Sequence, residues 1–122
     1  MKALGSLLVF LVAFWGLAQG FTIVTVDDLN RALADPKTFV IDVRTPQEYA
    51  GGHVPGAVNW PLQEIESWWS KVPKDRVVYI KCNTQNRSRV AAQYLMSKGY
   101  NDLKLVQGGI QAWRSRGYPI VR

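Results

Sequence analysis

The sequence predicts an α/β fold in which helices cover both faces of a parallel sheet. Two observations lead to this prediction. Short apolar runs alternate with segments that carry helix-start and helix-stop signals, and the connections between them are short. The chain has 122 residues, 48% hydrophobic and 20% charged, which suits one globular domain with an adequate core. Functional sites in such folds gather at the carboxyl ends of the strands.

The first half of the chain contains three expected strands and two short helices. The strands are apolar and contain β-branched residues, and they span residues 21–26, 39–43 and 57–59. Two capping boxes, each a threonine with an acidic residue three positions later, open the helices: Thr25 with Asp28, and Thr45 with Glu48. We therefore interpret Glu48 as a helix cap and assign it no chemical role.

The second half of the chain alternates three helices with two strands. The most hydrophobic strand, residues 77–80, is expected near the centre of the sheet, and the last strand spans residues 103–106. The helices are expected to begin at Pro61, Ser88 and Ile110. Helical spacing predicts the inner faces of the first two helices: Leu62, Ile65 and Trp69 in one, and Val90, Ala91, Tyr94 and Leu95 in the other.

The first twenty residues differ in composition from the rest of the chain. Lys2 precedes an uncharged apolar stretch, residues 3–18, that ends in small residues, as in a secretory signal peptide. This stretch is shorter than the roughly 20 apolar residues of a membrane span. We expect cleavage after Gly20 or, alternatively, after Ala18, with an uncleaved anchor as the third alternative. The domain then comprises residues 21–122, and the protein is expected to be periplasmic or secreted.

The chain is basic, with 15 Lys and Arg against 9 Asp and Glu, a formal net charge of +6 at pH 7. A surplus of this kind favours anionic ligands. The basic residues are scattered along the chain, so we interpret them as solvated surface charge and expect no nucleic-acid partner. Membrane contact is expected only through the signal peptide during export, and the domain is expected to be a monomer.

Cys82 is the only cysteine in the chain, and it lies between the expected central strand and the helix that follows. Backbone amides and the helix dipole stabilise an anion at such a turn, and Arg87 adds a permanent positive charge. At such a turn, a larger fraction of a cysteine is present as the thiolate, which is the nucleophilic form. The residues between Cys82 and Arg87 are small or polar, so the backbone there can curl around an anion. We therefore favour a nucleophilic cysteine in an anion-binding loop, with a buried structural cysteine as the alternative.

Three stretches of the chain resemble motifs of the rhodanese family, in the family's order and spacing. IDVRTPQEYAGGHVPGAVNWPL, residues 41–62, resembles the opening motif. KCNTQNRS, residues 81–88, is similar to the active-site loop, and VQGGIQAWRSRGYPI, residues 106–120, looks like the C-terminal motif. The resemblance covers essentially all of residues 21–122. It implies a three-layer α/β/α domain with a five-stranded parallel sheet in the strand order 1-5-4-2-3.

The resemblance also implies thiosulfate sulfurtransferase chemistry. Cys82 would take the outer sulfur of a small anionic donor such as thiosulfate and hold it as a persulfide, and a thiol or cyanide would accept it. The residues expected to bind the donor and the persulfide are Asn83, Thr84, Gln85, Asn86, Arg87 and Ser88. Asp42 and Arg44 are expected to organise the site, with Asp42 pairing with either Arg44 or Arg87. No metal or organic cofactor is implied.

Loop length separates this chemistry from its neighbours on the same fold. In related phosphatases and arsenate reductases, five residues separate the cysteine from the arginine and form a wider ring of amides. Four residues separate Cys82 from Arg87, so a terminal sulfur is favoured over a tetrahedral oxyanion. Gln85 stands where family loops commonly carry glycine, which puts the rate and the preferred donor in question. It also supports the main alternative, a module that binds anions or a partner protein without turnover.

His53 is the only histidine in the chain. A thiolate stabilised by amides needs no general base, and His53 lacks companion ligands, so we expect neither catalysis nor metal binding from it. Most of the tryptophans are interpreted as core or edge residues, and Trp113 matches a packing position of the family.

Overall fold

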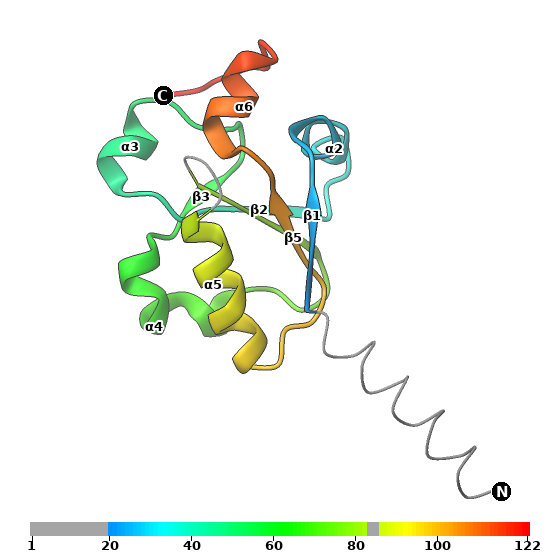
Figure 1. The fold of residues 1–122 in the computed structure, drawn as a ribbon, viewed down its shortest axis with the longest axis vertical. Helices are drawn as coiled ribbons and strands as arrows, with labels where there is room; N and C mark the ends of the chain where they lie inside the picture. Colours follow the sequence, from blue (N-terminus) through cyan, green and yellow to red (C-terminus); the bar gives the residue numbers. More distant parts are fainter. Residues whose placement is uncertain (1–19, 83–85) are drawn as a thin grey trace, which may run out of the picture.

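The computed structural model describes residues 20–82 and 86–122. In this part of the chain, five parallel strands form one sheet in the order β1-β5-β4-β2-β3, which confirms the predicted fold (Figure 1). The strands are β1 (Phe21–Val24), β2 (Thr38–Asp42), β3 (Val58–Asn59), β4 (Val77–Lys81) and β5 (Leu103–Val106). Strand β4 lies at the centre, as its hydrophobic sequence predicted.

Helices cover both faces of the sheet (Figure 1). On one face, α4 (Ile65–Trp68) and α5 (Asn86–Ser97) pack on a core that includes Ile41, Ile80 and Cys82. On the other face, α2 (Val26–Ala32) and α6 (Gly109–Ser115) pack on a second core. The remaining helix, α3 (Pro46–Ala50), follows β2. The two cores show why the strands read as continuous apolar runs, since a parallel sheet is buried on both faces.

The capping boxes at Thr25 and Thr45 are both confirmed. Each threonine side chain accepts a hydrogen bond from the backbone N–H three residues later, and each partner carboxylate accepts from the threonine's own N–H. Helix α2 begins at Val26 with Thr25 as its N-cap, so β1 ends at Val24 and not at residue 26. The other strand boundaries differ from the sequence-based ones by one residue at most, within the usual uncertainty of such assignments.

Two helices differ from their predicted form. The segment after Pro61 is broken into a 3₁₀ turn (Leu62–Glu64), α4 and a second 3₁₀ turn (Trp69–Lys71). Because these turns shift the helical phase, Trp68 is the buried tryptophan of this segment, whereas Trp69, predicted to face inward, is only partly buried against the same core. The indole N–H of Trp68 donates to the carbonyl of Pro61 at 2.8 Å.

Helix α5 begins at Asn86, two residues before the predicted start. Its buried stripe consists of Ser88, Ala91, Ala92 and Leu95, an i, i+3, i+4, i+7 pattern. Val90 does not belong to this stripe and is 51% exposed, so its predicted inward position is wrong.

The turn between β5 and α6 fixes how α6 meets the sheet. Gly108 has φ of 77°, a left-handed conformation, and an added Cβ would lie 2.6 Å from the Cβ of Ala112. This close turn lets the N–H of Ile110 donate to the carbonyl of Cys82 at 2.9 Å, which ties α6 to the end of β4.

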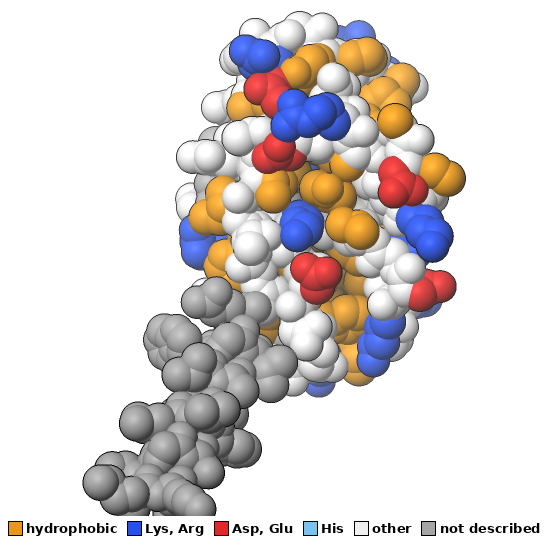
Figure 2. Space-filling view, turned by 90° about the vertical axis from the view of Figure 1, so that its right-hand side faces the viewer, with side chains coloured by type: hydrophobic (Ala, Val, Ile, Leu, Met, Phe, Trp, Pro, Cys, Tyr) orange, Lys and Arg blue, Asp and Glu red, His pale blue; other side chains and the backbone are white. Residues whose placement is uncertain are grey.

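Charged side chains of both signs are interspersed on the face shown in Figure 2, with hydrophobic side chains between them. No helix among residues 20–82 and 86–122 is both long and apolar enough to cross a membrane.

Candidate functional site

Cys82 lies directly after β4, at the carboxyl end of the central strand. Its side chain is 1% exposed and belongs to the core beneath α5. The thiol lies 3.6 Å from the hydroxyl oxygen of Ser88, which is itself buried in the first turn of α5. The strand end and the helix start therefore hold the sulfur and the hydroxyl together, across a connection of few residues.

Arg87, in the first turn of α5, forms a bidentate ion pair with Glu48 of α3. Its two terminal nitrogens lie 2.6 and 2.9 Å from the two carboxylate oxygens. The pair is about one-third exposed. The hydrogen bonds from Arg87 lower the pKa of Glu48 to about 2, an effect that outweighs the opposing effect of burial, and the amide of Thr45 adds to it. Glu48 is thus both a helix cap and the partner of Arg87.

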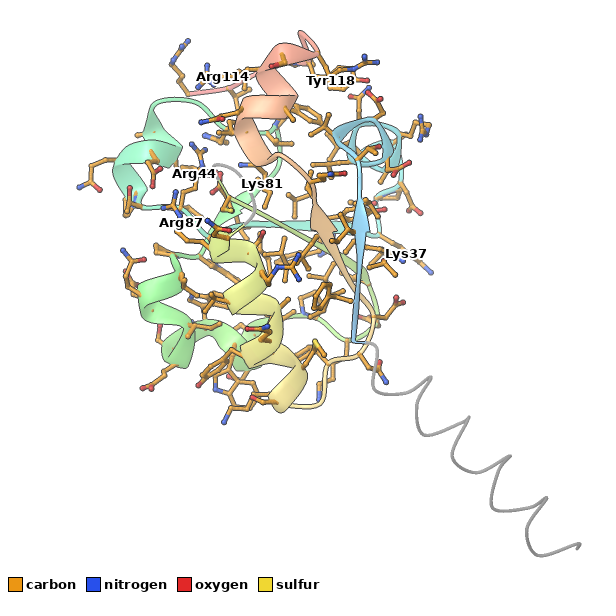
Figure 3. All side chains as sticks on the ribbon, in the orientation of Figure 1. Lys37, Arg44, Lys81, Arg87, Arg114 and Tyr118 are labelled. Carbon is orange, nitrogen blue, oxygen red and sulfur yellow. The ribbon has the colours of Figure 1, made fainter. Side chains whose placement is uncertain are left out.

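A second charged group lies on the other face of the sheet, where Asp42 accepts hydrogen bonds from two cations. Arg44 donates to both carboxylate oxygens, with its Nη2 2.8 Å from Oδ2. Lys81 Nζ lies 3.0 Å from the same oxygen. Asp42 and Lys81 are fully buried, and Arg44 is 3% exposed. Figure 3 shows Arg44, Lys81 and Arg87 gathered at one end of the sheet.

The pKa values of Asp42 and Lys81 reflect burial and pairing together. Burial alone would raise the pKa of Asp42, but hydrogen bonds from Arg44 and the charge of Lys81 outweigh it and hold that pKa below its usual value. For Lys81, burial dominates over the attraction of Asp42, and its pKa falls to about 8. Both groups are charged at neutral pH, so the site contains two buried cations and one buried anion.

Of the nine residues that the sequence assigned to the site, the structure describes six: Asp42, Arg44, Cys82, Asn86, Arg87 and Ser88. Cys82 and Ser88 are in contact, Asp42 and Arg44 are paired, and Arg87 lies in the first turn of α5. Asn86 begins α5 and is exposed. Asn83, Thr84 and Gln85 lie outside the described residues. Of the two partners proposed for Asp42, Arg44 is confirmed and Arg87 is wrong, because Glu48 holds the Arg87 guanidinium.

Lys81 and Glu48 are site components that the sequence analysis missed. A lysine as the last residue of the strand VVYIK, beside an aspartate in a paired strand, was the available signal for Lys81. For Glu48, the capping-box pattern already explained the residue, so its ion pair with Arg87 was not expected. Lys81 is opposite Asp42 in the register of β2 and β4, which explains their contact.

His53 packs on Tyr49 of α3, the helix that precedes it. Its Nδ1 lies 2.8 Å from the carbonyl oxygen of Tyr49, and its ring stacks on the Tyr49 ring with centroids 3.5 Å apart. Its backbone pairs with Val121 near the C-terminus. In the part of the chain that the structure describes, no three His, Cys, Asp or Glu residues are grouped so that they could hold a metal ion.

Comparison with known proteins agrees with this architecture. Residues 25–116 match the model of the rhodanese-like domain. A protein of Allochromatium vinosum named sulfurtransferase is 42% identical over 96 residues, which cover 78% of this chain and 90% of that protein. The chain therefore belongs to the rhodanese family.

Two solved structures illustrate the range of proteins with this fold. A rhodanese-related protein from Thermoplasma volcanium is 33% identical, with a TM-score of 0.72 over 80% of this chain and 95% of that one. A protein of unknown function from Rhodopseudomonas palustris, described as a possible tyrosine phosphatase, has a TM-score of 0.75 over 83% of this chain and 85% of that one. At 23% identity, this second likeness concerns the fold alone.

Proposed function

We propose that the protein is a sulfurtransferase that carries sulfane sulfur as a persulfide on Cys82. The observation that carries this proposal is the position of Cys82: a single thiol at the carboxyl end of the central strand, 3.6 Å from Ser88 in the first turn of the next helix. Family membership and the sulfurtransferase name of the Allochromatium vinosum relative support the reaction class. Thiosulfate is the donor that we propose.

In the first half-reaction, the Cys82 thiolate attacks the outer sulfur of thiosulfate. A bond forms between the two sulfurs, the bond to the sulfonate sulfur breaks, and sulfite leaves with the bonding electron pair. The product is an anionic persulfide. In the second half-reaction, cyanide attacks the terminal sulfur, thiocyanate leaves, and the Cys82 thiolate is regenerated. A thiolate acceptor takes the sulfur in the same way.

The environment of Cys82 suits a small anion and a small transferred group. The side chain is 1% exposed, which favours a compact donor over a bulky one. Cys82 directly follows β4 and α5 begins at Asn86, so the sulfur lies near a helix N-terminus, an environment that in general stabilises an anion. Arg87 supports this region through Glu48 and does not offer an unpaired guanidinium to the donor. Its proposed role is therefore to fix the start of α5.

A steady-state assay of thiocyanate formation from thiosulfate and cyanide tests the proposal. We expect turnover by the wild type and none by Cys82→Ser, because a serine hydroxyl is not ionised at neutral pH. Aryl phosphate hydrolysis, measured on the same preparation, should be negligible because the spacing of four residues suits sulfur and not phosphate. Efficient phosphate hydrolysis without thiocyanate formation would overturn the sulfurtransferase assignment and favour a phosphatase activity.

We also propose that the chain is exported and cleaved near Gly20. The basic, apolar and small-residue order of the first twenty residues supports this proposal. N-terminal sequencing of the protein from its native host should give Gln19 or Phe21 as the first residue. A soluble cytoplasmic protein that retains Met1 would contradict it.

A further inference from the structure

Lys81 is a buried cation to which the proposed mechanism gives no role. It is the last residue of β4, and Cys82 follows it directly. Successive residues of a strand point to opposite faces, so Cys82 lies in the core under α5 while Lys81 reaches Asp42 on the other face. Lys81 therefore does not touch the sulfur, but only the backbone of one strand separates the two side chains.

Charge balance does not require Lys81. Arg44 alone neutralises Asp42, since its backbone N–H, Nε and Nη2 all donate to that carboxylate. Lys81 adds a second positive charge, so the three side chains carry a net charge of +1. The nearby pair of Arg87 and Glu48 has no net charge. Burying an ammonium group without need is unfavourable, so a surplus buried charge beside Cys82 calls for an electrostatic explanation.

The charges of Lys81 and Cys82 influence each other. A negative sulfur on Cys82 favours the protonated form of Lys81 and opposes the effect of burial on its pKa. Because an electrostatic interaction acts on both partners, the charge of a protonated Lys81 in turn attracts a negative charge on the sulfur. The other charges that act on Lys81 are Asp42 and Arg44. The lowered pKa of Asp42 keeps that carboxylate charged across the neutral range, whereas the pKa of Lys81 is about 8, so Lys81 changes charge near neutral pH.

We propose that Lys81 is a positioning residue for sulfur transfer, whose buried charge stabilises the thiolate and the persulfide of Cys82 through the end of β4. This inference rests on the proposed function, because the persulfide is the anion to be stabilised. The effect is present while Lys81 is protonated and disappears as the pH rises through about 8, where Lys81 loses its proton.

Three variants separate this role from a structural one. Lys81→Met removes the charge and keeps an unbranched apolar chain, while Asp42 and Arg44 remain paired. Lys81→Arg keeps a charge that does not titrate. Lys104→Met removes a lysine from the neighbouring strand β5, where its side chain is 28% exposed beside Asp102, and serves as the matched control.

Two rates are measured from pH 6.5 to 9.5 by intact mass: alkylation by iodoacetamide, and sulfur uptake from thiosulfate. Both report Cys82 without ambiguity, because the chain has one cysteine. At pH 6.5 we expect Lys81→Met to be about tenfold slower than the wild type in both, the size of effect that one nearby charge produces in a partly screened interior. The difference should disappear by pH 9.5. Lys104→Met should match the wild type throughout.

Equal rates at pH 6.5, or a ratio that stays constant with pH, would overturn the inference, since a structural defect has no reason to follow the protonation of Lys81. Lys81→Arg should equal the wild type at pH 6.5 and exceed it at pH 9.5. This comparison decides the matter if Lys81→Met does not fold, and equality at both pH values would count against the proposal. If no sulfane donor loads the wild type, the proposed function fails, and the alkylation rates alone still decide the role of Lys81.

Discussion

Glu48 holds Arg87 through two short hydrogen bonds of 2.6 and 2.9 Å, which join α3 to the first turn of α5. The two residues are 39 positions apart in the sequence. The pair lies at the carboxyl end of the sheet, near β4, the strand that Cys82 directly follows. It therefore links the two sequence motifs of the family in space, and the helix that begins near the sulfur is fastened to the motif that contains Asp42 and Arg44.

Glu48→Gln tests the function of this link. Glutamine preserves the cap, because its amide oxygen still accepts from Thr45, but it removes the charge that holds Arg87. At pH 7 we expect a loss of up to about 1 kcal/mol in unfolding free energy, as for a partly exposed ion pair, and slower sulfur uptake by Cys82. Glu66→Gln, on an exposed position of α4, is the control. Uptake that is unchanged in Glu48→Gln would show that the link does not serve the site.

The same pair predicts a definite pH dependence of stability. The pKa of Glu48 is about 2 in the folded protein, below its ordinary value of 4.5. A lowered carboxylate pKa means that the stabilisation is complete above pH 4.5 and is lost as the pH falls toward 2. Urea unfolding at pH 7 and at pH 2.5 should therefore show a difference between the wild type and Glu48→Gln that shrinks at the lower pH. A difference that grows in acid would contradict the assignment.

Asp42→Asn should be among the most destabilising conservative substitutions in the chain. It leaves Arg44 and Lys81 buried without their anion, and breaking a buried pair in this way costs about 3–5 kcal/mol. Adding Lys81→Met removes one of the two orphaned cations, so the double variant should be more stable than Asp42→Asn alone. Urea unfolding of the full cycle measures the coupling, with Asp75→Asn as an exposed control. Strict additivity would mean that Lys81 and Asp42 do not interact.

Lys81 also predicts how stability changes in alkaline solution. Its pKa is about 8 in the folded protein, against 10.5 for an ordinary lysine. Between these values the unfolded chain binds more protons than the folded one, so this lysine makes stability rise with pH in that window. The stability of the wild type relative to Lys81→Met should therefore increase from pH 8 to pH 10. A constant difference would mean that Lys81 titrates normally.

His53→Ala separates packing from catalysis. The substitution removes the stack on Tyr49 and the hydrogen bond to its carbonyl, so we expect a loss of about 1–2 kcal/mol in unfolding free energy. The folded fraction should take up sulfur at the wild-type rate, since His53 is assigned no proton transfer. Uptake that falls far below the folded fraction, measured by circular dichroism on the same sample, would assign a chemical role to this histidine.

The order of elements was predictable because the local signals agree with the tertiary structure. The capping boxes at Thr25 and Thr45 depend on residues three positions apart, so a sequence displays them completely. The apolar run of β4 likewise predicts a central strand. The broken helix after Pro61 was not predictable in this way, because Leu62, Ile65 and Trp69 fit helical spacing although two 3₁₀ turns interrupt the segment.

The candidate site was likewise predictable only where its contacts are local in the sequence. Cys82 and Ser88 are only six positions apart, and the sequence itself predicts a strand-to-helix turn between them. The contacts of Lys81 with Asp42 and of Arg87 with Glu48 each span 39 positions and depend on strand register and helix placement. The sequence indicates that Asp42 needs a cation and offers two candidates, but only the folded sheet shows that Arg44 is the partner and that Lys81 joins it.

The proposed function requires that Cys82 carries the transferred sulfur. Intact-mass analysis of residues 21–122 after incubation with thiosulfate tests it most directly, because the chain has a single cysteine. We expect a gain of one sulfur atom that cyanide or excess thiol reverses, and no gain in Cys82→Ser. A folded wild-type protein whose mass does not change with thiosulfate or any other sulfane donor would contradict the sulfurtransferase assignment and favour a binding module on the same fold.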